Sequence, residues 1–145
     1  SATSRALETL FNSLAGHEVN IKGTILKPNM VTSGSTASEQ ANISLVAEKT
    51  VKCLQNSLPD DLPAVTFLSG GQSDIDSTAH LDKMNKISSN PWKLSFSYGR
   101  ALQQAALKAW RGNVENETAA QEAFSHRAKM NKLAALGEWE SSLEN

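Results

Sequence analysis

The sequence lacks several features that would point to a secreted, membrane or nucleic-acid-binding protein. It contains a single cysteine, Cys53, which cannot form an internal disulfide and therefore fits a reducing cytoplasm. No apolar stretch is long enough to span a bilayer, and the first twenty residues are polar and amphipathic, unlike a secretory signal. The formal net charge is -1, so no basic excess favours nucleic acid or an anionic membrane as a partner.

The sequence also has little that could bind a metal ion. His17, His80 and His126 are scattered and show no metal-ligand spacing, so we expect surface or structural roles for them. Cys53 lies on a predicted helix and is expected to be partly buried and inert. The other conspicuous side chains are expected to be packing residues (Trp92, Trp110 and Trp139) or solvated loop and cap charges (Asp60, Asp61, Asp74 and Asp76).

What is present is the pattern of a globular α/β protein. The 145 residues are enough for one domain with one core, and 39% are hydrophobic and 20% charged. Apolar positions at helical spacing alternate with short β-prone runs. The pattern predicts helices over residues 4–16, 43–54, 73–87, 102–110 and about 116–136, strands over 19–27, 64–68 and 92–97, and a loop over 32–40.

The predicted strands recur roughly every thirty to forty residues with a helix between each pair, which is typical of parallel strands joined by right-handed crossovers. Three such strands alone would leave bare edges, and parallel sheets are normally covered on both faces. A (β/α)8 TIM barrel closes its edges but needs roughly 250 residues. We therefore expect residues 1–145 to form the C-terminal part of a single TIM-barrel domain whose upstream strands are absent from this chain.

Lys27 ends the first predicted strand, directly before Pro28. In β/α proteins the active site lies at the C-terminal ends of the strands, so a lysine there would point into a barrel mouth. Burial or nearby cations can free such an amine to form a Schiff base with a ketone. The alternative interpretation is an ordinary surface lysine at a strand end.

The other two predicted strands end in glycine-containing loops that suit a phosphate group. Ser69-Gly70-Gly71 follows the second strand, and glycines let backbone N–H groups approach an anion closely. Gly99 and Arg100 follow the third strand, where the arginine could add a bidentate charge. Each loop alone could be an ordinary turn. Two adjacent loops of this kind match the recurrent phosphate site of such barrels.

These segments together resemble the class I fructose-bisphosphate aldolases, a family that uses a Schiff-base lysine. The resemblance rests on Gly23–Val31, Phe67–Ser73 and Leu94–Gln103, and continues through Leu107–Trp110 and Glu115-Asn116. It implies a (β/α)8 barrel to which this chain contributes the sixth to eighth strands. It also implies reversible cleavage of fructose 1,6-bisphosphate to dihydroxyacetone phosphate and glyceraldehyde 3-phosphate, in the cytoplasm.

The resemblance assigns roles to individual residues. Lys27 would attack the C2 ketone, and Ser69, Gly70, Gly99 and Arg100 would hold the C1 phosphate. No metal or other cofactor is implied, because the iminium takes the place of a metal as electron sink. The implied partner is a phosphorylated sugar, and full-length family members are usually homotetramers.

The sequence departs from the family in three respects. The family's proton-transfer carboxylates and its other active-site cations belong to earlier strands. Animal and plant members carry a C-terminal tail that ends in Tyr, whereas Tyr98 is the single tyrosine here. Ser33 stands where the family often has Pro. Two alternatives therefore stay open: a truncated, catalytically incompetent piece that serves at most for binding or scaffolding, and a Schiff-base lyase for a different phosphorylated ketose.

Overall fold

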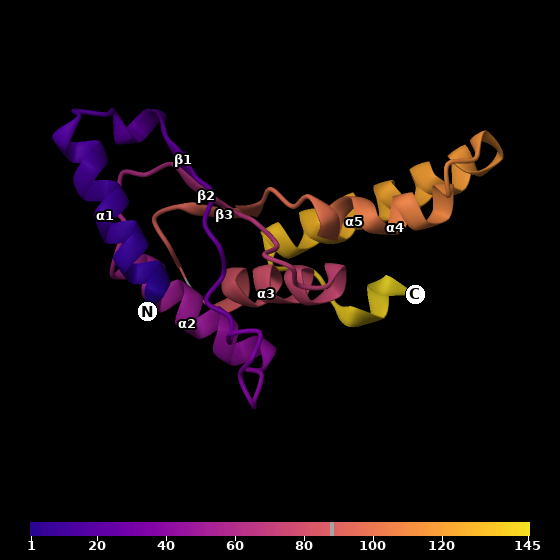
Figure 1. The fold of residues 1–145 in the computed structure, drawn as a ribbon, viewed down its shortest axis with the longest axis horizontal. Helices are drawn as coiled ribbons and strands as arrows, with labels where there is room; N and C mark the ends of the chain where they lie inside the picture. Colours follow the sequence, from indigo (N-terminus) through magenta and orange to yellow (C-terminus); the bar gives the residue numbers. More distant parts are fainter. Residues whose placement is uncertain (88) are drawn as a thin grey trace.

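The computed structural model describes residues 1–87 and 89–145, in which helices alternate with short strands (Figure 1). The elements are α1 (Ala2–Gly16), η1 (Ile21–Gly23), β1 (Ile25–Leu26), α2 (Ile43–Gln55), β2 (Ala64–Phe67), α3 (Asp74–Ile87), β3 (Lys93–Phe96), α4 (Arg100–Trp110), η2 (Val114–Asn116), α5 (Glu117–Leu136) and η3 (Ser141–Glu144). The predicted order of helices and strands is confirmed.

The strands form one parallel sheet in the order β1-β2-β3. Leu26 of β1 lies opposite Val65 of β2, which in turn lies opposite Leu94 of β3. Helix α2 connects β1 to β2, and α3 connects β2 to β3. These connections are the predicted crossovers between parallel strands.

Only one face of this sheet is covered within the described residues. Helices α2 and α3 lie on the same side of it (Figure 1), and Val65 and Phe67 on that side are fully buried. Side chains alternate along a strand, so the residues between them point the other way. Ile25 on that second side is 62% exposed. Because parallel sheets are normally buried on both faces, this open face is the unusual feature of the chain.

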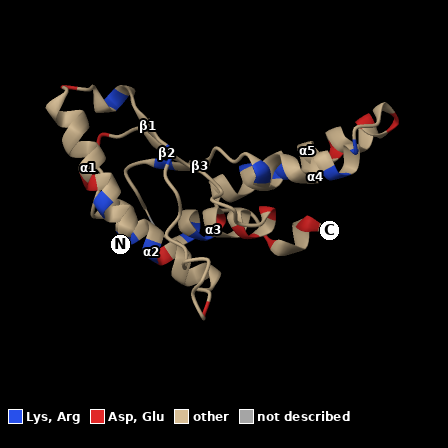
Figure 2. Cartoon of the chain, in the orientation of Figure 1, with Lys and Arg blue, Asp and Glu red and all other residues tan. Residues whose placement is uncertain are grey.

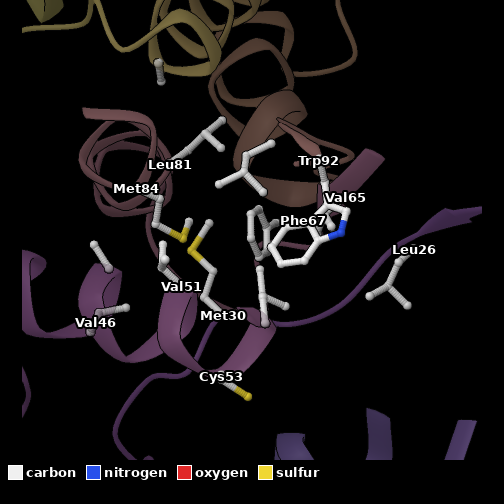
Figure 3. Packing of buried hydrophobic residues seen from close by; sticks show 14 of the residues in the cluster. Leu26, Met30, Val46, Val51, Cys53, Val65, Phe67, Leu81, Met84 and Trp92 are labelled. Carbon is white, nitrogen blue, oxygen red and sulfur yellow. The ribbon is translucent and has the colours of Figure 1, made fainter. Parts of the chain in front are cut away.

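The hydrophobic core fills the space between the covered face and the helices. Figure 3 shows Phe67 of β2, Met30 of the segment after β1, and Leu81 and Met84 of α3 pointing into it. Burying a side chain of this size stabilises the fold by about 1.5–3 kcal/mol relative to leaving it exposed. Met30 is 2% exposed and lies three residues after Lys27. Core packing therefore fixes the chain immediately beyond the candidate catalytic lysine.

Local capping interactions set the ends of several helices. The Ser73 hydroxyl accepts a hydrogen bond from the Asp76 amide over 3.0 Å, which confirms the predicted start of α3. The Asn42 side chain caps α2 in the same way, at 2.9 Å from the Leu45 amide. Helix α5 ends at Gly137, whose φ of 71° lies in the left-handed region that favours glycine.

The predicted strand over residues 19–27 is wrong over most of its length. Only the two residues of β1 pair as a strand, and Ile21–Gly23 before them form the 3-10 turn η1. The Asn20 side chain accepts from the Lys22 amide, and the Asn20 carbonyl accepts from the Gly23 amide, each over 3.1 Å. These backbone groups are therefore paired within the segment and do not need a neighbouring strand.

The predictions for the tryptophans and for Cys53 are confirmed in part. Trp92 and Trp139 are buried, as expected for packing residues. Trp110 is 44% exposed, so that prediction is wrong for this chain. It lies at the end of α4, which pairs with α5 in a hairpin that projects from the rest of the molecule (Figure 1). Cys53 is buried more fully than predicted.

Candidate active site

The C-terminal ends of β1, β2 and β3 lie side by side at one edge of the sheet, because the strands are parallel and in register. Two hydrogen bonds extend this register beyond the strands. The Leu68 amide donates to the Pro28 carbonyl over 3.0 Å, and the Ser97 amide donates to the Phe67 carbonyl over 2.8 Å. The predicted site residues all follow these strand ends: Lys27, Ser69, Gly70, Gly99 and Arg100.

Lys27 lies on the uncovered face of the sheet. Its neighbours Leu26 and Pro28 are buried on the helix side, so the alternation of side chains turns Lys27 the other way. Extending the β1–β2 register by one residue places it beside Thr66, which pairs with Ser95 of β3. The Lys27 side chain is exposed. The described residues therefore do not supply the burial that the sequence suggested for it.

Residues Ser69–Gln72 form a tight turn directly after β2. The Gln72 amide donates to the Ser69 carbonyl over 3.1 Å, and the two residues between them, Gly70 and Gly71, have φ values of 60° and 84°. A turn with positive φ at both central positions strongly favours glycine there. Ser69 is 7% exposed, whereas both glycines are exposed. The turn thus exposes the backbone of Gly70 and Gly71 at the strand end, with no side chain covering it.

Helices α3 and α4 both begin beside this edge, but their N-termini differ in charge. The first turn of α3 carries Asp74 and Asp76, whose carboxylates already complement the helix dipole and would repel an anion. The first turn of α4 has no acidic residue, begins with Arg100, and has Gly99 as an N-cap without a side-chain hydrogen bond. The N-terminus of α4 is therefore the better place for a phosphate.

Tyr98 anchors the loop that carries Gly99 and Arg100. Its side chain is buried, and its hydroxyl donates to the Ser77 carbonyl in α3 over 2.8 Å. Burial raises the pKa of the Tyr98 hydroxyl above its ordinary value, so it stays a protonated donor. This contact ties the β3–α4 loop to α3.

The histidines differ in their surroundings. His80 is buried in α3, and burial lowers its pKa although the nearby Asp76 carboxylate opposes the shift. His17 is exposed at the end of α1. His126 lies on α5, with its Nε2 at 3.5 Å from a Glu144 carboxylate oxygen. Among the described residues, no group of three or more His, Cys, Asp or Glu side chains could hold a metal ion.

The family model for class I fructose-bisphosphate aldolases matches residues 1–145. The chain belongs to this family. A protein of Xylella fastidiosa (strain 9a5c) named "Probable fructose-bisphosphate aldolase class 1" is 53% identical over 138 residues. That match covers 94% of this chain and 41% of the relative. The protein of Arabidopsis thaliana named "Fructose-bisphosphate aldolase 4, cytosolic" is 48% identical over 136 residues, which are 93% of this chain and 35% of the relative.

A solved structure agrees with the aldolase fold. It is the fructose-bisphosphate aldolase of Plasmodium falciparum, crystallised in complex with TRAP and a small-molecule inhibitor. Its TM-score to this chain is 0.94 at 39% identity, and the match covers 97% of this chain and 40% of that one. The predicted TIM-barrel fold class is thus confirmed for the part of the barrel that this aldolase chain contains. The chain spans about two fifths of the length of the curated relatives it matches.

Basic residues (blue in Figure 2) and acidic residues (red) both occur along the helices of this aldolase chain. None of the helices in the described part is long and apolar enough to cross a membrane.

Two contacts of the strand-end loops could not be predicted from the sequence. They are the Tyr98–Ser77 hydrogen bond and a bond between His80 and Gln72. Each joins residues that come together only when a strand-end loop packs on α3, so their spacing along the chain carries no signal. The sequence offered one sign of the first contact, because Tyr98 stands between an apolar strand and Gly99, where a buried hydroxyl would need a partner.

Proposed function

We propose that the protein carrying this chain is a fructose-bisphosphate aldolase in which Lys27 forms the Schiff base and the loops after β2 and β3 hold the substrate phosphate. The observation that carries the proposal is the arrangement at the sheet edge. Lys27 lies on the open face beside β2, and the bare Ser69–Gln72 turn and the acid-free N-terminus of α4 follow the neighbouring strands. Family membership supports the same reaction.

In this mechanism the Lys27 amine attacks the C2 ketone of fructose 1,6-bisphosphate, and loss of water gives an iminium. The C4 hydroxyl then loses its proton, the C3–C4 bond breaks, and its electron pair moves to the iminium nitrogen as an enamine forms. Glyceraldehyde 3-phosphate leaves. Protonation of the enamine at C3 and addition of water release dihydroxyacetone phosphate and restore the amine. The protein contributes the nucleophile and holds the reacting carbon in place.

The phosphate would be bound by Ser69, the Gly70 backbone, the Gly99 backbone and Arg100. An uncapped helix N-terminus supplies N–H groups and a favourable dipole, and the Arg100 guanidinium adds a bidentate charge. We propose a cytoplasmic location and a reaction without metal, since two plant relatives are named cytosolic and cytoplasmic and the iminium serves as electron sink. The homotetramer expected from the family stays a prediction.

The test traps the Schiff base. The complete gene product is incubated with dihydroxyacetone phosphate, reduced with borohydride, and digested for peptide mass spectrometry. We expect the adduct on Lys27 and its complete loss in Lys27→Arg, because arginine keeps the charge but is not a nucleophile at neutral pH. Lys22→Arg, an exposed lysine five residues earlier, is the matched control and should keep the adduct.

Trapping on residues 1–145 alone, paired with a cleavage assay, addresses the alternative of a catalytically incompetent piece. The exposure of Lys27 in this chain favours that alternative for the 145 residues by themselves. An adduct on Lys27 that does not turn over would support it. An adduct at another lysine, or none in the folded complete gene product, would overturn the role proposed for Lys27.

A further inference from the structure

A buried histidine links the turn after β2 to the segment that follows Lys27. His80, in α3, is 5% exposed, and its Nδ1 lies 2.5 Å from the Gln72 side-chain oxygen. The Gln72 side-chain nitrogen donates a weaker bond to the sulfur of Met30 over 3.5 Å. Met30 is three residues beyond Lys27. One row of contacts therefore runs from α3 through the turn after β2 to the segment after β1.

Two of the four residues of the turn offer no side chain that could hold it. Gly70 and Gly71 are exposed and carry no side chains that could pack. A groove of about 720 Å³ lies between residues 32–46 and the start of α3, and the turn forms part of its wall. The Gln72 side chain is thus a contact through which α3 can fix the turn, in addition to the backbone hydrogen bond from Leu68 to Pro28 and the Ser73 cap.

The chemistry of the contact fixes the direction of the hydrogen bond. An amide oxygen can only accept, so the Nδ1 of His80 carries the proton. The neutral ring then has an acceptor at Nε2, and this atom is buried without a hydrogen-bond partner among the described residues. An unpaired buried nitrogen costs stability, and an apolar residue would avoid this cost. Packing alone therefore does not explain why this position carries a histidine.

We propose that His80 is a positioning residue for phosphate binding. Through Gln72 it holds the Ser69–Gln72 turn in place, and through Met30 it sets the turn against the Lys27 segment. The inference rests on the proposed function, because it assumes that Ser69 and Gly70 contact the phosphate. Donors that are held in place before the substrate arrives bind it without a further ordering cost.

The test compares two substitutions of nearly equal shape in the complete gene product. His80→Asn keeps an N–H donor at the position of Nδ1, whereas His80→Leu has the same branching and no donor. We expect His80→Leu to raise the KM for fructose 1,6-bisphosphate about tenfold and change kcat less than twofold, because the phosphate lies away from the bond that breaks. His80→Asn should stay within about twofold of the unmodified protein in both constants.

A second variant approaches the contact from the other side. Gln72→Met keeps the length of the side chain but removes the acceptor, and it should raise KM as His80→Leu does. It also decides the matter if His80→Leu fails to fold. An unchanged KM in His80→Leu or Gln72→Met, or equal damage in His80→Leu and His80→Asn, would overturn the proposal. Failure of the proposed function looks different, since the unmodified protein would then give neither cleavage nor an adduct on Lys27.

Discussion

At the scale of single residues, the turn after β2 depends on glycine. Gly71 has a φ of 84° and open space around the position of an added Cβ, so substitution there would meet backbone strain and no clash. Gly70 has a φ of 60°, and an added Cβ would also approach Leu68 at 3.3 Å. Gly71 is therefore the cleaner position at which to measure the strain.

We predict that Gly71→Ala lowers the free energy of unfolding by about 1–2 kcal/mol, the cost of holding an L-residue in the left-handed region. Gly34→Ala is the matched control, because Gly34 also lies in a loop with open space but without a positive φ. It should change stability by less than about 0.5 kcal/mol. Urea denaturation measures both. Equal effects at the two positions would mean that the turn tolerates alanine.

The sequence predicted some residues of the candidate site but not the contacts between them. The sequence could propose Lys27, the glycines and Arg100 as site residues because each stands next to a strand end, where β/α folds place their chemistry. The bond between His80 and Gln72 could not be found, because eight residues of separation give no sign that a turn folds back onto its helix. The sequence pattern predicts solvated cap charges at Asp74 and Asp76, but does not show that their carboxylates would repel an anion at the start of α3.

At the scale of elements, helices were easier to predict than the first strand. Periodic apolar positions predicted α2 and α5 to within one or two residues. The β-prone run over residues 19–27 was misleading, since a strand also needs a neighbour for its backbone groups. In this segment Asn20 pairs those groups locally, and only the two residues of β1 reach β2.

The closing element η3 is held by a charged contact to α5. Arg127 is 4% exposed and pairs with the Glu144 carboxylate, which also accepts from the Trp139 indole over 2.9 Å. Burial alone would raise the pKa of Glu144, but the hydrogen bonds from Arg127 and Trp139 outweigh it and hold the pKa below its ordinary value. The ionised form is therefore the one that stabilises the fold.

We predict that Glu144→Gln lowers the free energy of unfolding by about 1–3 kcal/mol at pH 7, because charged hydrogen bonds to Arg127 are weakened. The folded-state pKa lies below the unfolded value, so this contribution is complete above about pH 4.5 and is lost as the pH falls through the folded pKa. Glu140→Gln, an exposed neighbour, should show no such difference. Urea denaturation at several pH values checks this. A pH-independent difference would contradict it.

At the scale of the whole molecule, the open face of the sheet is the main result. The strands β1 and β3 end the sheet within the described residues, and Lys27 stands on the side that no described helix covers. The curated relatives are about two and a half times as long as the matched region. We propose that residues 1–145 are the C-terminal part of one barrel domain, in which further strands would enclose Lys27 and supply the proton-transfer groups.

The placement of Cys53 beneath α1 has a practical consequence. Its thiol is buried with the Ser4 hydroxyl at 3.3 Å, and Leu7 is the one residue of α1 classed as buried. A buried thiol reacts only when its cover moves away, so its labelling rate measures how often α1 detaches.

We expect Leu7→Ala to speed the labelling of Cys53, followed by peptide mass spectrometry, by tenfold or more, because removing a buried leucine costs about 2–5 kcal/mol. Leu10→Ala, at an exposed position of the same helix, should leave the rate nearly unchanged. Equal rates in the two variants would show that α1 does not control access. If Leu7→Ala alone speeds the labelling, the rate at the single cysteine reports how often the first helix detaches.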